Sequence, residues 1–243
     1  MSGIGLPDWY NIKKAGAISA LGDLGELAVR LGSPVTFDRR GDVIFIDSFE
    51  EGLLKWSTEI VGSGAAVALS HDAARCGGWS CKLTAGAQEE ESALISHYIP
   101  YPVLGRLGFE CSFAFDNQLK RLVMSAALYD GDEALTATVQ YNYADKKLQY
   151  LGTDLAWHDV ATGLDLYLAG NPFWIWKLVV DYSARKFVRL IMNNVEYDVS
   201  GIAVAQAVST VNPCLLFHVA NYTLGGSTRI VYIDDVIVYQ NEP

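Results

Sequence analysis

From residue 43 onward, apolar and polar residues alternate in short runs that glycine, asparagine, aspartate or proline interrupts about every ten residues. Alternation with a period of two is typical of a strand with one buried face, and the runs are rich in β-branched and aromatic residues. No long helical period competes with this pattern. The predicted strands cover 43–49, 65–70, 79–84, 93–99, 107–115, 122–129, 134–143, 147–151, 174–182, 186–192, 214–221 and 229–239.

Two hairpins can be recognised among these runs. Residues 139–143 return through a short polar turn into 147–150, and residues 176–181 return into 187–190. Regularly spaced strands without intervening helices predict an antiparallel β-sandwich rather than a parallel α/β sheet. The expected fold is therefore an all-β, lectin-like jelly roll over residues 43–243.

Residues 1–42 have a different composition, with seven glycines scattered through a stretch of small residues. Apolar residues recur at helical spacing between 18 and 31, which permits a short amphipathic helix, and a strand over 26–31 is the alternative. Trp9 and Tyr10 could anchor the segment, but it is too small for a core of its own. We expect an extended arm that contacts a neighbouring subunit.

The charge balance excludes some partners. With 18 basic and 28 acidic residues the net charge is -10, so the chain has no basic surface for nucleic acid or anionic membranes. Only 19% of residues are charged, which is below the typical quarter and indicates buried interfaces in a homo-oligomer. Polar residues interrupt the N-terminus before a secretory signal develops, and no stretch approaches about 18 clean apolar residues. We expect neither Sec export nor a membrane span.

The four cysteines could form disulfides, in three possible pairings, or remain thiols. Alternation places Cys81 beside Leu83 on one strand face and Cys111 among phenylalanines on another, so both are expected to be buried free thiols. The states of Cys76 and Cys214 stay open. The spacing of the cysteines does not indicate a zinc site.

Residues 45–84 and 229–239 resemble the two ends of carbohydrate-binding modules of families four and nine, which are galactose-binding-like jelly rolls. Residues 174–201 are similar to the β-meander of laminin-G and concanavalin-like sandwiches. The matching positions are Phe49, Glu50, Gly52 and Trp56, then Gly77 or Gly78, Ser80 or Cys81, Lys82 and Leu83, and finally Tyr232, Ile233, Asp234, Asp235 and Val236.

The resemblance implies that the first and last strands of the sandwich are neighbours and that a structural calcium ties them together. The matching ligands would be Glu50 with Asp234 or Asp235, because carboxylate oxygens suit Ca²⁺. The alternative is that these acids cap turns or pair with Arg75 or Arg229.

Aromatic residues are the candidates for sugar contact. Tyr141 and Tyr143 share a strand face and Trp157 lies nearby in sequence, so the three could form a platform that stacks on sugar rings. The alternative is that these rings belong to the core or to a subunit interface.

Sequence strings that carry known chemistry are missing. The chain has neither Glu-x-Asp-x-x-Glu, which sets paired carboxylates for glycoside hydrolysis, nor Gly-x-Ser-x-Gly. The four histidines are dispersed, and His218 is expected to be a hydrogen-bonded residue within a sheet. These absences predict no catalytic residues and a chain that is not an enzyme.

The leading functional hypothesis is a structural or assembly protein, such as a virion surface, decoration or fibre subunit, that associates with itself or with other structural subunits. We expect it in a virion or another extracellular assembly. The first alternative is a glycan-binding module, and the second is a polysaccharide-degrading enzyme.

Overall fold

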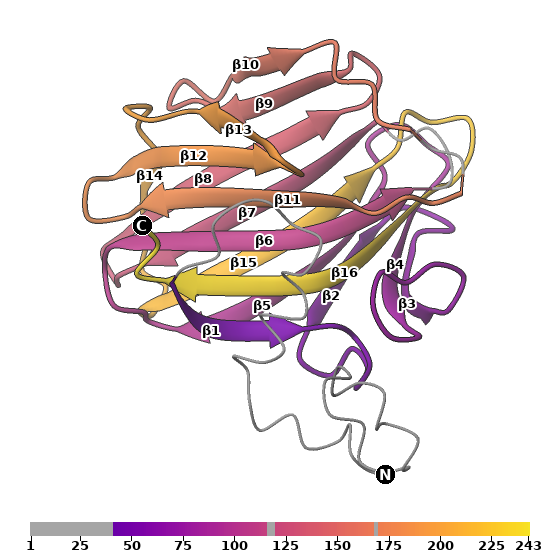
Figure 1. Ribbon diagram of the computed structural model, residues 1–243, viewed down its shortest axis with the longest axis horizontal. Helices are drawn as coiled ribbons and strands as arrows, with labels where there is room; N and C mark the ends of the chain where they lie inside the picture. The colour runs from indigo at the N-terminus through magenta and orange to yellow at the C-terminus, as the bar shows by residue number, and fades with distance from the viewer. Residues whose placement is uncertain (1–40, 116–119, 168–169) are drawn as a thin grey trace, which may run out of the picture.

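The computed structural model describes residues 41–115, 120–167 and 170–243, and in these ranges the chain forms sixteen strands and no helix (Figure 1). The strands are β1 (Asp42–Asp47), β2 (Ser57–Val61), β3 (Ala66–Ser70), β4 (Ser80–Ala85), β5 (Ser92–Pro100), β6 (Arg106–Phe115), β7 (Arg121–Tyr129), β8 (Glu133–Asn142), β9 (Lys147–Leu151), β10 (Trp157–Thr162), β11 (Trp174–Asp181), β12 (Lys186–Met192), β13 (Val195–Asp198), β14 (Ala205–Val208), β15 (Cys214–Tyr222) and β16 (Arg229–Gln240).

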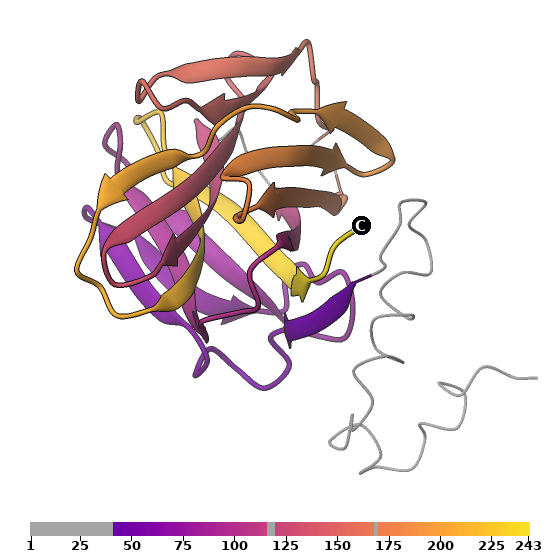
Figure 2. The same cartoon turned by 90° about the vertical axis from the view of Figure 1, so that its left-hand side faces the viewer.

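The strands form two eight-stranded antiparallel sheets in two layers (Figures 1 and 2). Sheet A has the order β13-β12-β11-β6-β16-β4-β3, and β1 also pairs with β16. Sheet B has the order β10-β9-β8-β7-β15-β5-β2, and β14 also pairs with β8. The prediction of an all-β antiparallel sandwich is therefore confirmed.

Alternate side chains of both sheets meet in one core. Phe109 of sheet A stacks on Phe217 of sheet B with 5.7 Å between ring centroids, and both rings are fully buried. Trp176 and Phe113 extend the same core, with ring centroids 6.0 Å apart. Burying one such side chain stabilises the fold by roughly 2 kcal/mol, so the aromatic contacts between the layers hold the two sheets together.

The structure confirms the strands and both hairpins that alternation predicted, but it adds four more. The strands β2, β10, β13 and β14 are short and lie at sheet edges, and every residue of β2 is exposed. An exposed edge strand needs no buried face, so its sequence carries no alternation that could reveal it.

The first and last strands of the sandwich pair, as the resemblance implied. Asp42 lies opposite Gln240 and Asp47 lies opposite Val236, so β1 and β16 are antiparallel neighbours (Figure 1). The same edge of β16 pairs with β4 over Arg229 to Ile233. β16 therefore changes neighbour from β4 to β1 within one strand, and the intervening residues pair with neither.

Several other expectations concern particular segments. The predicted arm over 1–42, with its helix or strand, falls outside the described residues except for its last two positions. All four cysteines are free; Cys81 and Cys111 are buried, as predicted, and burial raises the pKa of both thiols. Among the described residues, no helix has the length and apolar character to cross a membrane.

Candidate functional site

The outer side of sheet B carries a set of polar side chains that we call the polar face. On β7, Leu122, Met124 and Ala126 belong to the core, so alternation turns Ser125 outward. The same argument applies to the neighbouring strands, whose apolar positions also face the core. The polar face consists of Ser57, Ser96, Ser125, Thr138, Gln140, Gln149 and His218.

Five of these residues form one row across five strands. Ser57 on β2, Ser96 on β5, His218 on β15, Ser125 on β7 and Thr138 on β8 are successive cross-strand partners. Directly opposite residues in a sheet have Cβ atoms about 5 Å apart, so the side chains are immediate neighbours. The hydroxyls of Ser125 and Thr138 are hydrogen-bonded at 2.8 Å. The imidazole of His218 thus stands between serines on both sides.

His218 is uncharged at neutral pH. Burial lowers the pKa of its imidazole from 6.5 to about 4, because the charged form loses solvation. A neutral imidazole offers one hydrogen-bond donor and one acceptor. The centre of the row therefore combines hydroxyls with an unprotonated imidazole.

A second group on the polar face consists of two glutamines and an aspartate. Gln140 Nε2 donates to Gln149 Oε1 at 2.7 Å, and Gln149 Nε2 donates to Asp159 Oδ1 at 2.7 Å. Lys147 lies 2.9 Å from the other oxygen of Asp159 and lowers the pKa of that carboxyl. We call Gln140, Gln149 and Asp159 the amide relay; it runs inward from the edge strand β10 to β8.

Among the described residues, the middle of the polar face lacks cationic side chains. On the central strands β5, β7, β8 and β15, all of which are described, the basic residue is Arg121 at the start of β7. Its guanidinium is ion-paired with Glu90 at 2.7 Å. Small side chains such as Val123, Ala127 and Ala220 fill the outward positions between the polar groups. This surface suits a ligand without charge.

Tyrosines border the polar face at one end. Tyr98 on β5 is 56% exposed. It faces outward because the odd-numbered positions Ile95 and Ile99 of the same strand belong to the core. Tyr129 at the end of β7 is half-buried, and the loop residue Tyr101 is exposed. These tyrosines were not among the predicted site residues, although alternation along 93–99 already turns Tyr98 away from the core.

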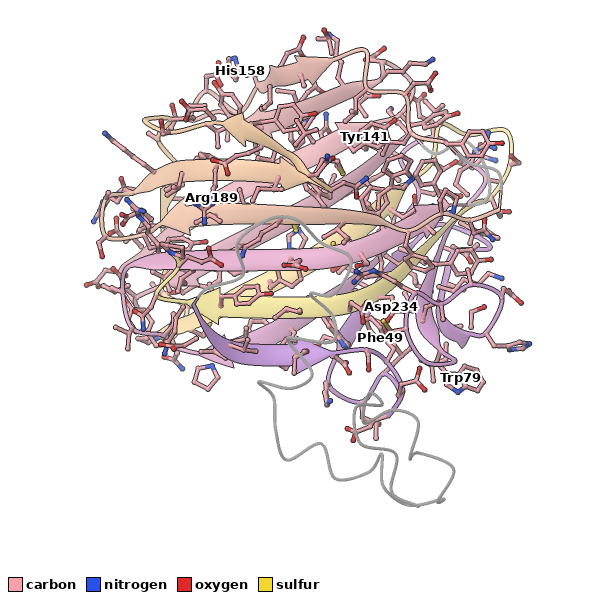
Figure 3. The ribbon with its side chains drawn as sticks, viewed as in Figure 1. Phe49, Trp79, Tyr141, His158, Arg189 and Asp234 are labelled. Atoms are coloured by element: carbon pink, nitrogen blue, oxygen red, sulfur yellow. The ribbon has the colours of Figure 1, made fainter. Side chains whose placement is uncertain are left out.

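The structure separates the three aromatic residues predicted to bind sugar. Tyr141 is fully buried between the sheets and its hydroxyl donates to the carbonyl of Leu164 at 2.9 Å (Figure 3). Tyr143 shares that inner face and packs edge-on against Phe115. These two rings follow the core alternative, because their shared strand face is the inner one. Trp157 begins β10 on the same side as Asp159, so it borders the polar face, and its sugar contact stays a prediction.

The residues predicted to bind calcium hold a loop instead. Glu50 Oε1 accepts hydrogen bonds from the backbone N–H groups of Gly78 and Trp79, both at 2.8 Å. Gly77 has a φ of +70°, and a Cβ at this position would lie 2.3 Å from the same oxygen. The close approach of Glu50 therefore requires glycine at position 77.

Asp234 and Asp235 hold the other half of that loop. Asp234 Oδ2 accepts from the backbone N–H groups of Arg75 at 2.7 Å and Cys76 at 3.2 Å. The Arg75 guanidinium lies 2.8 Å from Asp235 Oδ2 and 3.2 Å from the Ser112 hydroxyl. Both aspartates lie where β16 changes neighbour from β4 to β1, so the loop fills the gap between these strands.

These contacts do not fit a calcium site. The carboxylates already accept from N–H groups or pair with Arg75, whereas Ca²⁺ needs six to eight oxygen ligands. In the described ranges, no group of three or more His, Cys, Asp or Glu side chains is arranged to hold a metal. The arginine alternative accounts for Asp235, and backbone amides account for Glu50 and Asp234.

Burial at this junction gives a testable pH dependence. Burial and the neighbouring Asp235 raise the pKa of Asp234 from 3.8 to about 7. The folded state therefore holds a proton that the unfolded state releases, and this contribution to stability is lost as the pH rises from about 4 through 7. We compare the free energy of unfolding of the native chain with that of Asp234→Asn. The native chain should exceed the variant by about 2 kcal/mol more at pH 5 than at pH 8.

Urea unfolding at both pH values measures this difference, and the exposed Asp132→Asn variant serves as its control. An advantage that stays constant or grows toward pH 8 would show that Asp234 is ionised in the folded chain.

Acidic side chains line a hollow beside the β7–β8 turn, but the carboxylates of Asp130 and Glu133 already have hydrogen-bond or ion-pair partners. Glu133 pairs with the guanidinium of Arg185 and accepts from the side chain of Gln206. Asp130 accepts from the backbone N–H groups of Asp132 and Glu133, as expected for a hairpin turn. The hollow is lined by Asp130, Asp132, Glu133, Gln206, Ala207 and Val208.

Comparison with known proteins identifies the fold but not a family. Neither family models nor curated sequences match the chain. An endo-β-1,4-glucuronan lyase from the fungus Trichoderma reesei superposes with a TM-score of 0.59 at 12% identity, over 82% of this chain and 96% of the lyase. A carbohydrate esterase from the Shiga toxin-encoding bacteriophage φ24B gives a TM-score of 0.59 at 16% identity, over 84% and 100%. The cellulose-induced protein Cip1 gives 0.55 at 14% identity, over 81% and 97%.

These likenesses correct the prediction that the chain is not an enzyme. That prediction was wrong in treating missing sequence strings as an exclusion, because a lyase and an esterase share this fold. The missing Glu-x-Asp-x-x-Glu excludes one arrangement of carboxylates only. The structural-subunit hypothesis has no specific support among these similar structures.

Proposed function

We propose that the chain binds an uncharged polysaccharide along the polar face of sheet B. The observation that carries the proposal is the row of hydroxyls around His218, which crosses five strands and has no cation at its centre in the part of the chain that the structure describes. Sugars are recognised by hydrogen bonds to their hydroxyls and by rings that stack on their apolar faces. The polar face supplies the first, and Tyr98 supplies the second.

The fold comparisons are consistent with this proposal, since the similar structures include a lyase and an esterase that act on carbohydrates. The size of the face supports it as well. Four strand spacings of about 4.8 Å separate Ser57 from Thr138, so the row is roughly 19 Å long. A row of this length can contact several consecutive sugar units.

A glycan array followed by titration calorimetry tests the proposal. We expect binding to neutral polysaccharides, and we expect Tyr98→Ala to weaken it about tenfold because stacking contributes on the order of 1 kcal/mol. Tyr98→Phe keeps the ring and should retain the affinity within about twofold. The absence of binding to every neutral glycan on the array would refute the proposal, whereas equal affinities of the two variants would remove Tyr98 from the site.

A second candidate function is hydrolysis of an ester group carried by the bound glycan, and the state of His218 favours it. A base that takes a proton from water must be unprotonated at the working pH; His218 is uncharged there, and it stands on the polar face between Ser96 and Ser125. The oxygen of that water would attack the ester carbonyl. As the ester C–O bond breaks, the His218 imidazolium would return the proton to the departing sugar oxygen, which leaves a carboxylic acid and the sugar alcohol. Elimination from a uronate is less consistent with the face, because its centre offers no cation to neutralise the sugar carboxylate.

A further inference from the structure

We propose that the amide relay makes Gln140 a residue that determines specificity: its Oε1 accepts a hydrogen bond from a sugar hydroxyl and disfavours a sugar carboxylate. This inference rests on the proposed glycan binding at the polar face. It adds the group that distinguishes a neutral sugar from its uronate counterpart.

The relay fixes the orientation of both amides. An ionised Asp159 can only accept hydrogen bonds, so Gln149 must turn its NH₂ group toward it. The carbonyl oxygen of Gln149 then faces Gln140 and requires the NH₂ group of Gln140. Consequently the remaining polar atom of Gln140 is the acceptor Oε1, and a flipped amide would place two like groups together at either step.

That acceptor is left without a partner. Gln140 is 2% exposed, and its Oε1 has no hydrogen-bond partner among the described residues. A buried acceptor without a donor destabilises the unbound site, and a donating ligand removes that cost. Gln140 stands one pleat from Thr138 on the outward side of β8, and Val123 opposite it is small. A ligand on the row of hydroxyls therefore passes beside this amide.

The chemistry of the ligand follows from this polarity. A sugar hydroxyl can donate to Gln140 Oε1, whereas an ionised carboxylate can only accept and would face another acceptor. A site that is built to hydrogen-bond one group discriminates strongly against an analogue that cannot make the bond. The favoured ligand is a polysaccharide whose primary hydroxyls are intact.

The experiment compares one glycan in two forms. The probe is the neutral glycan bound best on the array, and its counterpart is the same glycan after its primary hydroxyls are oxidised to carboxylates. We expect the native chain to bind the neutral form at least tenfold more tightly in calorimetry. Asp159→Asn permits the reversed relay, in which Gln140 presents its NH₂ group, and should reduce this preference to threefold or less.

The control removes a charge without touching the relay. Asp154 lies in the turn before β10 and contacts His158, so Asp154→Asn changes the charge of the same sheet edge. We expect this variant to keep the native preference within about twofold. An equal loss of preference in both variants would show that charge alone discriminates, and an unchanged preference in Asp159→Asn would overturn the relay.

Two further outcomes separate the inference from the proposed function. If the native chain binds both forms equally, glycan binding stands and the inference fails. If the native chain binds neither form of any array glycan, the proposed function fails and the inference fails with it.

Discussion

Replacing Arg75 with methionine is expected to lower the free energy of unfolding by about 3 kcal/mol, because it leaves a buried carboxylate without its cation. The Asp235 side chain is fully buried, and the Arg75 side chain, whose guanidinium faces it, is only 12% exposed. Methionine retains most of the length of the side chain, so lost packing contributes little. The backbone N–H of residue 75 still reaches Asp234 in this variant. Urea unfolding monitored by tryptophan fluorescence measures the change.

A double variant separates the charge effect from damage to the loop. Asp235 has a φ of 48°, and asparagine accepts this left-handed backbone conformation better than most residues. Arg75→Met combined with Asp235→Asn should therefore recover at least half of the loss, since no unpaired charge is buried. A single variant that costs less than 1 kcal/mol, or a double variant no more stable than it, would mean that the ion pair is not what holds the loop.

The second large effect concerns catalysis at the polar face. If His218 activates water for ester hydrolysis, His218→Asn should lower the rate of acetate release from the acetylated form of the bound glycan at least 100-fold. Affinity for the unmodified glycan should change by less than about fivefold, because asparagine still offers a donor and an acceptor. Single-turnover assays and calorimetry measure the two quantities separately.

The pH profile of the same reaction provides a further check on His218. Because the pKa of His218 is about 4, its protonation should not change the rate between pH 6 and 8. The rate should fall as the pH approaches 4. A profile that instead falls between pH 7 and 6 would assign the base to another residue. Absence of acetate release from the native chain would falsify the second candidate function without affecting the proposed glycan binding.

The sandwich could be predicted from the sequence because strands with one buried face carry apolar residues at alternate positions. β6 places large apolar residues such as Phe113 and Phe115 at alternate positions, and β15 does the same around Phe217; only a strand with one face in the core requires that pattern. β2 could not be predicted, because all five of its residues are exposed and no burial constrains them. Pairing of β1 with β16 joins positions far apart in the chain, and only the resemblance indicated it.

The candidate site was harder to predict for a physical reason. The row around His218 contains one residue from each of five strands, and their sequence separations are set by loops that alternation does not describe. For Tyr141 the sequence left both a sugar contact and a core position open, because the aromatic residues of a strand look alike whether they face the core or solvent. Its inward direction follows only once Ala137 and Val139 are seen to share its side.

The pairing of β1 with β16 also determines how the domain responds to mechanical force. Asp42 and Gln240 lie opposite each other at one end of the ladder, and Asn241 Nδ2 donates to Asp42 Oδ2 at 2.6 Å. A load applied between these two positions pulls perpendicular to the strands, so the hydrogen bonds break one after another rather than together. The two strands should separate at low force as far as Asp47. Beyond that residue β16 changes neighbour, and the ion pair of Arg75 with Asp235 resists further separation. The junction that replaces the predicted calcium site is thus placed as a mechanical stop.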